Sequence, residues 1–181
     1  MDSYLERLQE AIASATAELS VEQLTHRPGG HLDSHPDRKW SVAEVLEHLY
    51  LTYTGTRKGF ERCLQLGKPM ASSITVAQRV RIALVIQLGY FPEGRKSPER
   101  AVPKGMPVDK VMADIRPQIA AMGDVIAKCE ARHGTRMRVL DHPILGPLTA
   151  EQWRKFHWVH GSHHVKQILR LRTVKSPAIR M

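Results

Sequence analysis

Residues 149–171, TAEQWRKFHWVHGSHHVKQILRL, contain four of the ten histidines in the 181-residue chain. Thr149 and Gln152 have the spacing of a capping box, so a helix is predicted from there to about Leu171. Because successive helical residues turn by about 100°, all four histidines fall within about 60° of His160. That face comprises Trp153, His157, His160, His163, His164, Gln167 and Leu171, while most of the charge falls on the other faces, including Arg154, Lys155, Lys166 and Arg172. The histidine face is therefore predicted to point into the protein.

His160 and His164 are one helical turn apart, a spacing that suits two ligands of one metal ion. Their Cβ atoms would lie about 5–6 Å apart, so both imidazoles could reach an ion at the ~2.0–2.1 Å of Zn–N bonds. His48 is the candidate for a third ligand, because it lies on another predicted helix that could face the last one. Small neighbours such as Gly55 and Gly59 suit a cleft open to water. Three neutral imidazoles would leave one position for water or substrate.

A structural role is the alternative for these histidines, because buried histidines are often satisfied by hydrogen bonds alone. His157 and His163 are predicted to surround the ligands or to lie at the boundary of the core, with His157 the better substitute ligand. Gln167 could hold a ligand imidazole or a water, or be a buried structural amide. Glu44 could act as a general base, but at the start of a helix it is predicted to be a cap. The sequence assigns no catalytic residue.

The rest of the chain shows further helical patterns. Apolar residues recur every three or four positions over residues 2–19, 41–66 and 111–133, and a shorter pattern runs from a Thr75 and Gln78 capping box to Gly89. Loop residues 28–36 separate the first two patterns. Pro117 is predicted to kink its helix or to restart it. Residues 91–107 are rich in Gly, Pro, Lys and Arg, and are predicted to form a surface excursion that could border a pocket. No segment alternates as a strand would.

These patterns predict an all-α fold of one domain. We expect an antiparallel four-helix bundle with an extra short helix and a Pro/Gly-rich excursion over residues 1–175, and a short basic tail over residues 176–181. The interior of such a bundle commonly holds metal sites built from facing helices.

Composition and length exclude several classes of protein. The chain is 42% hydrophobic and 25% charged, which is typical of folded globular domains. The N-terminal residues MDSYLERLQEAIAS do not resemble a secretory signal peptide, and the longest apolar run, residues 82–91, is short against the roughly 20 residues of a membrane helix. Cys63 and Cys129 are predicted to be buried free thiols. We therefore expect a cytoplasmic protein without a membrane span.

The charge of the chain permits an anionic partner. The formal net charge is +9, and seven Lys or Arg residues but no acidic residue follow Glu151. A non-catalytic basic helical bundle that binds an anionic partner such as nucleic acid is therefore the competing hypothesis. However, the basic residues are scattered over several helices, and no helix-turn-helix or zinc-finger spacing is present. Nucleic acid is the less favoured partner.

Two segments resemble the DinB-like superfamily of metalloenzymes. Residues 40–53, WSVAEVLEHLYLTY, open a helix with Trp-Ser and place a histidine seven residues after the serine. Residues 142–168, HPILGPLTAEQWRKFHWVHGSHHVKQI, resemble a branch of the superfamily without an assigned function. The resemblance implies a four-helix bundle, frequently dimeric, in which three histidines hold a divalent ion such as zinc or nickel. By motif, the ligands are His48, His160 and His164.

The resemblance also implies a class of reaction. Some members transfer low-molecular-weight thiols such as bacillithiol or mycothiol to electrophiles, or act on small thiol conjugates. We therefore expect a metal-dependent transferase or hydrolase of small molecules, in which the metal would lower the pKa of a bound thiol. The resemblance does not specify the substrate.

Overall fold

The computed structural model describes residues 2–27, 40–90 and 97–173 and is predominantly helical. Its elements are α1 (Ser3–Thr16), α2 (Val21–Thr25), α3 (Val42–Leu66), α4 (Val76–Ile82), the π-helix η2 (Ala83–Gln87), the 3₁₀ helix η3 (Glu99–Ala101), α5 (Val108–His133), β1 (Arg138–His142), β2 (Gly146–Thr149) and α6 (Ala150–Thr173). The predictions for the loop residues 28–36, for residues 91–96 of the excursion and for the tail lie outside the described residues.

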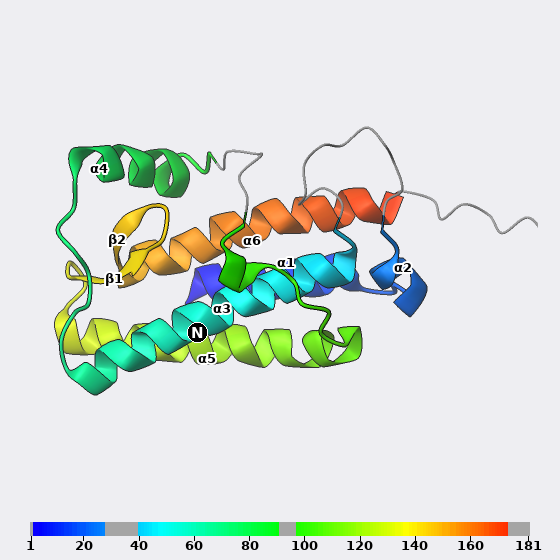
Figure 1. Ribbon diagram of the computed structural model, residues 1–181, viewed down its shortest axis with the longest axis horizontal. Coiled ribbons are helices and arrows are strands. Elements are labelled where there is room, and N and C mark those ends of the chain that lie inside the picture. The colour runs from blue at the N-terminus through cyan, green and yellow to red at the C-terminus, as the bar shows by residue number, and fades with distance from the viewer. Residues whose placement is uncertain (1, 28–39, 91–96, 174–181) are drawn as a thin grey trace, which may run out of the picture.

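Four long helices lie side by side. Helix α3 packs along α5, α1 packs along α6, and α5 contacts both α1 and α6 (Figure 1). The core between them is made of the side chains that the helical periodicity predicts to be inward, including Leu8, Leu46, Tyr53, Phe60, Ile119, Met122 and Ile126. A glycine permits the closest approach of α1 to α6, since a Cβ on Gly161 would lie 2.2 Å from Leu8 Cδ1.

Side-chain caps start the helices where the sequence predicts them. Ser41 with Glu44 opens α3, and Thr75 with Gln78 opens α4. Thr149 and Gln152 exchange the same pair of bonds at the start of α6, at 3.0 and 3.2 Å. Helix α3 stops at Gly67, which has a φ of 68° that favours glycine. The two helices that carry the candidate ligands are therefore fixed at their N-termini by local sequence.

The structure corrects one predicted helix boundary and excludes one of the two alternatives at Pro117. The first helix ends at Thr16 rather than near residue 19, and α2 follows, opened by its own capping box at Ser20. Pro117 does not restart a helix, because α5 is continuous from Val108 to His133 around it. Packing along α3 and the other helices outweighs the backbone hydrogen bond that a proline cannot make.

The prediction that no strand is present is also wrong. Strands β1 and β2 form an antiparallel hairpin in which Leu140 pairs with Leu148 and His142 with Gly146. The strands are five and four residues long, and the first three residues of β2 are all buried, so the pattern lacks the alternation expected of a strand. Gly146 has a φ of 84°, and its missing side chain leaves room for Gln78 of α4.

The hairpin closes one end of the helical layers. Trp153 Nε1 of α6 donates to the carbonyl oxygen of Leu140 at 3.1 Å, and the Met70 N–H donates to that of Val139 at 2.8 Å. In Figure 1 the hairpin lies between α4 and the start of α6. Within the three described ranges, no helix is long and apolar enough to span a membrane.

Candidate metal centre

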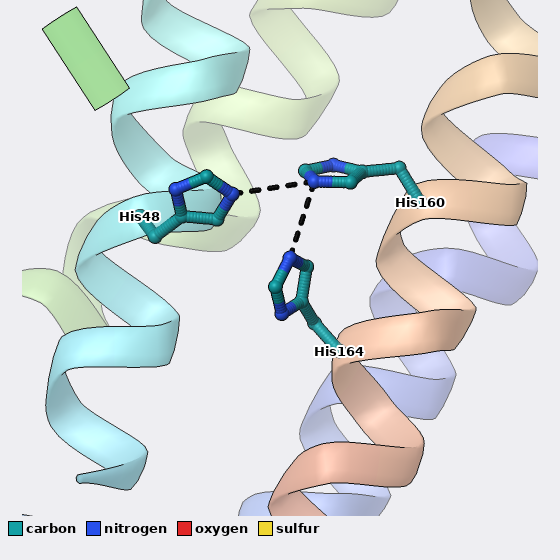
Figure 2. A group of neighbouring side chains, drawn as sticks. All are labelled: His48, His160 and His164. Carbon is teal, nitrogen blue, oxygen red and sulfur yellow. Dashed lines mark hydrogen bonds between the residues drawn. The ribbon is translucent and has the colours of Figure 1, made fainter. Parts of the chain in front are cut away.

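The three histidines predicted as ligands come together in the core. His48 lies nearly two turns into α3, and His160 and His164 project from successive turns of α6 toward it (Figure 2). All three side chains are buried, with exposed fractions of 3%, 6% and 6%. The prediction that His48 lines a cleft open to water is therefore wrong. The ring of Trp40 packs on that of His48, with the two ring centroids 5.1 Å apart.

One nitrogen of each imidazole points to a common centre. Nε2 of His160 lies 3.2 Å from Nε2 of His48 and 3.1 Å from Nε2 of His164. The candidate ligand atoms of the three residues all lie within 4.8 Å of one another, and this is the one such group of three or more His, Cys, Asp or Glu found in the described chain. The arrangement could hold a metal ion.

Acceptors fix the proton position on two of the rings. Nδ1 of His48 lies 2.7 Å from the carbonyl oxygen of Ala101, which can only accept, so Nδ1 donates. Nδ1 of His164 donates in the same way to Oε1 of Gln167 at 2.9 Å. A neutral imidazole that carries its proton on Nδ1 presents a lone pair at Nε2. Two lone pairs therefore face Nε2 of His160, and a His160 ring with its proton on Nδ1 would add the third lone pair of a three-nitrogen donor set.

Burial keeps the two histidines of α6 uncharged. Burial, and secondarily the other histidines, lowers the pKa of His164 to about 3. The same causes hold the pKa of His160 well below its ordinary value. Neutral imidazole is the form that binds metal, so at neutral pH both residues of α6 are in the ligating state without the loss of a proton.

Aromatic rings surround the ligands. The Phe156 ring stacks on that of His160, with centroids 5.4 Å apart and an interplanar angle of 9°. Phe156 of α6 and Trp40, which precedes α3, thus pack on two of the three imidazoles. Helical periodicity cannot assign this role, because an apolar side chain at a buried position is ordinarily a core residue.

The other polar residues singled out from the sequence have diverse surroundings. Gln167 contacts a candidate ligand directly, and the half-buried ring of His163 lies 5.2 Å from that of His164. His157 is fully buried outside the group of three, with Nε2 3.1 Å from the Thr56 hydroxyl. Glu44 caps α3 and pairs with Arg27. Cys63 and Cys129 are both buried and free, as predicted.

One basic residue of α6 corrects the picture of an outward-facing charged surface. Arg154 is buried and pairs with Glu130 of α5 at 2.5 Å and with Asp2 at 3.8 Å. Arg172 donates to the carbonyl oxygen of Ala15 at 2.9 Å, at the C-terminal end of α1. Because α6 contacts α1, α3 and α5, a wider arc of the helix is interior than the histidine face alone. Arg154 therefore does not contribute to a basic surface, whereas Arg172 is exposed and contacts the end of α1.

The segment between η2 and α5 supplies a contact that sequence reasoning did not assign. Ala101 lies in η3 and accepts the His48 bond, and the neighbouring Glu47 of α3 binds the backbone of residues 104–106. In its described part, residues 97–107, the excursion packs on α3 beside His48; that it borders a pocket stays a prediction. Every residue type has a backbone carbonyl, so no sequence pattern could have identified Ala101 as the acceptor for His48.

A scan against family models matches residues 5–170 to the family described as "Protein of unknown function (DUF1569)". The chain belongs to this family. The match includes all three histidines of the centre. Neither the curated proteins nor the solved structures yield a match.

Proposed function

We propose that this member of the DUF1569 family binds one divalent metal ion through Nε2 of His48, His160 and His164. The observation that carries the proposal is the convergence of the three Nε2 atoms, with the opposite nitrogens of His48 and His164 engaged by an acceptor. Two inward lone pairs in a buried site repel each other unless a proton or a cation lies between them; a proton on Nε2 of His160 would serve in metal-free protein, and a divalent ion would take its place when bound.

The donor set indicates which metals to expect. Imidazole nitrogens suit zinc, nickel, copper and iron, whereas magnesium and calcium require oxygen ligands. Zinc and nickel are the proposed cofactors, in accord with the DinB-like resemblance of the two histidine-bearing segments. Gln167 and the Ala101 carbonyl would hold two of the ligands in the correct tautomer, as outer partners commonly do in metal sites.

The proposed activity is that of a metal-dependent transferase or hydrolase of small molecules, with a low-molecular-weight thiol as the favoured substrate. When bound, a divalent ion with three protein ligands supplies a position at which a thiol or water loses its proton near neutral pH. The three imidazoles would hold the ion, and the rings of Trp40 and Phe156 pack on two of them. A thiolate formed there would attack an electrophile.

The same proposal covers the bundle architecture, the oligomeric state and the location of the protein. We take the four long helices as a DinB-like antiparallel bundle that forms homodimers and acts in the cytoplasm. The resemblance of residues 40–53 and 142–168 to that superfamily supports this.

A thiol-consumption assay tests the activity. Zinc- or nickel-loaded protein is mixed with bacillithiol and 1-chloro-2,4-dinitrobenzene; the thiolate sulfur forms a bond to the ring carbon, chloride leaves, and the thiol proton goes to solvent. We expect a rate above that of His48→Ala and His164→Ala protein prepared in the same way. Equal rates for the three proteins would contradict thiol transfer. Metal content of the same samples tells whether the binding site or only the reaction class is wrong.

A further inference from the structure

Glu47 is a buried carboxylate that precedes the candidate ligand His48 in α3. Its side chain is 2% exposed. Its oxygens accept three successive backbone N–H groups, from Lys104 at 2.6 Å, Gly105 at 3.0 Å and Met106 at 3.1 Å. Consecutive N–H groups that converge in this way form a concave anion-binding nest. Burying a carboxylate is costly without such partners, so the contact indicates a specific role.

The nest holds the segment that orients His48. Ala101 lies three residues before Lys104, and its own N–H donates to the Pro98 carbonyl at 2.8 Å. The Ala101 carbonyl accepts from Nδ1 of His48 at 2.7 Å. Two adjacent residues of α3 therefore hold one short segment, Glu47 by its carboxylate and His48 by its ring. The nest therefore acts together with the 3₁₀ turn of η3 to keep the Ala101 carbonyl opposite Nδ1.

We infer that Glu47 is a positioning residue for the histidine centre: by anchoring residues 104–106, it holds the Ala101 carbonyl where it fixes the proton of His48 on Nδ1 and turns Nε2 to the centre. This inference deepens the proposed function and rests on it for its consequence for metal binding. The consequence for the tautomer of His48 holds in metal-free protein.

Two variants open the nest from opposite sides. Glu47→Gln keeps the shape of the side chain but turns one acceptor into a donor that faces backbone N–H groups. Gly105→Ala leaves Glu47 unchanged; its Cβ meets nothing within 4 Å, but the φ of 85° is unfavourable for alanine. Glu130→Gln is the matched control, because it also removes a partly buried carboxylate contact, with Arg154, but not one that touches the segment.

Two readouts test the inference on these proteins. Long-range ¹H–¹⁵N correlation spectra of metal-free protein at pH 8 report the tautomer of His48, and competition with a chromophoric chelator reports the Kd for zinc. We expect His48 to carry its proton on Nδ1 in the wild type and in Glu130→Gln, and to populate the Nε2–H tautomer in the other two. We expect the Kd for zinc to rise about tenfold or more in Glu47→Gln and Gly105→Ala and to stay within twofold in Glu130→Gln.

The outcomes separate the two proposals. An unchanged His48 tautomer in both nest variants, with amide exchange of residues 104–106 accelerated, would overturn the positioning role. A changed tautomer with an unchanged Kd for zinc would overturn its relevance to the metal. If the wild-type protein binds no zinc or nickel, the proposed function fails, and the tautomer alone then decides whether Glu47 positions His48. If one nest variant does not fold, the other carries the test.

Discussion

His164 and Gln167 lie one turn apart on α6, and their contact sets which nitrogen of His164 faces the centre. The Gln167 oxygen accepts from Nδ1 at 2.9 Å, so Nε2 is left to ligate. The same division of roles on His48 uses a backbone carbonyl. Removing an outer partner of a ligand typically weakens metal binding by about 10–100-fold.

The Gln167 contact gives a prediction at this scale. In Gln167→Leu the acceptor is lost, and we expect the Kd for zinc, measured by chelator competition, to rise at least about tenfold. Gln167→Glu keeps an acceptor opposite Nδ1 and serves as the matched control, with affinity close to that of the wild type. Wild-type affinity in Gln167→Leu would show that this amide does not orient His164.

The residues of the centre differ in how far the sequence predicts them. His160 and His164 follow from helical spacing alone, and His48 from its place on a facing helix, because each contributes a side chain whose chemistry is recognisable. Ala101 and Phe156 could not be predicted, since one acts through its carbonyl and the other has the chemistry of any core residue. Glu47 also gave no signal, because its partners are backbone N–H groups almost sixty positions later.

Pro117 interrupts the backbone hydrogen bonding of α5 at an exposed position. Proline removes one helical hydrogen bond and its ring crowds the preceding turn, which costs about 3 kcal/mol in a helix interior. Proline also restricts the unfolded chain, and this offsets up to about 1 kcal/mol of that cost. We expect Pro117→Ala to raise the free energy of unfolding by about 2 kcal/mol in urea denaturation. A lower value than in the wild type would mean that the proline geometry itself stabilises α5.

Local capping signals explain why the starts of some helices are predicted correctly while other elements are not. The starts of α3, α4 and α6 are correct because each depends on two side chains three residues apart, a local signal. The hairpin was missed because its strands are short and the buried residues of β2 follow one another without alternation, so their conformation depends on the helices around them. The course of α5 through Pro117 is likewise determined by packing against α3.

The stability of the whole molecule depends on pH through its buried histidines. Burial lowers the pKa of His157 and of His142 to about 3, from an ordinary value of 6.5. Between these values the unfolded chain binds protons that the folded protein excludes, so stability is fully present above pH 6.5 and is lost as the pH falls toward 3. Each such histidine contributes about 1.4 kcal/mol per pH unit.

This linkage is measurable in metal-free protein kept in chelator. We expect the free energy of unfolding in urea to fall between pH 6.5 and pH 4.5, and His157→Gln, which keeps a polar group beside Thr56, to lower the slope by about one proton. If His157→Gln shows the same pH slope as the wild type, the result contradicts a neutral, buried His157.

Metal content tests the central claim most directly. Untagged protein is incubated with zinc and with nickel, dialysed, and analysed by inductively coupled plasma mass spectrometry beside a His160→Ala, His164→Ala double variant whose fold is checked by circular dichroism. We predict close to one divalent ion per wild-type chain and none in the variant. A wild-type chain that retains neither ion would contradict the account and leave the three histidines as packing of the core.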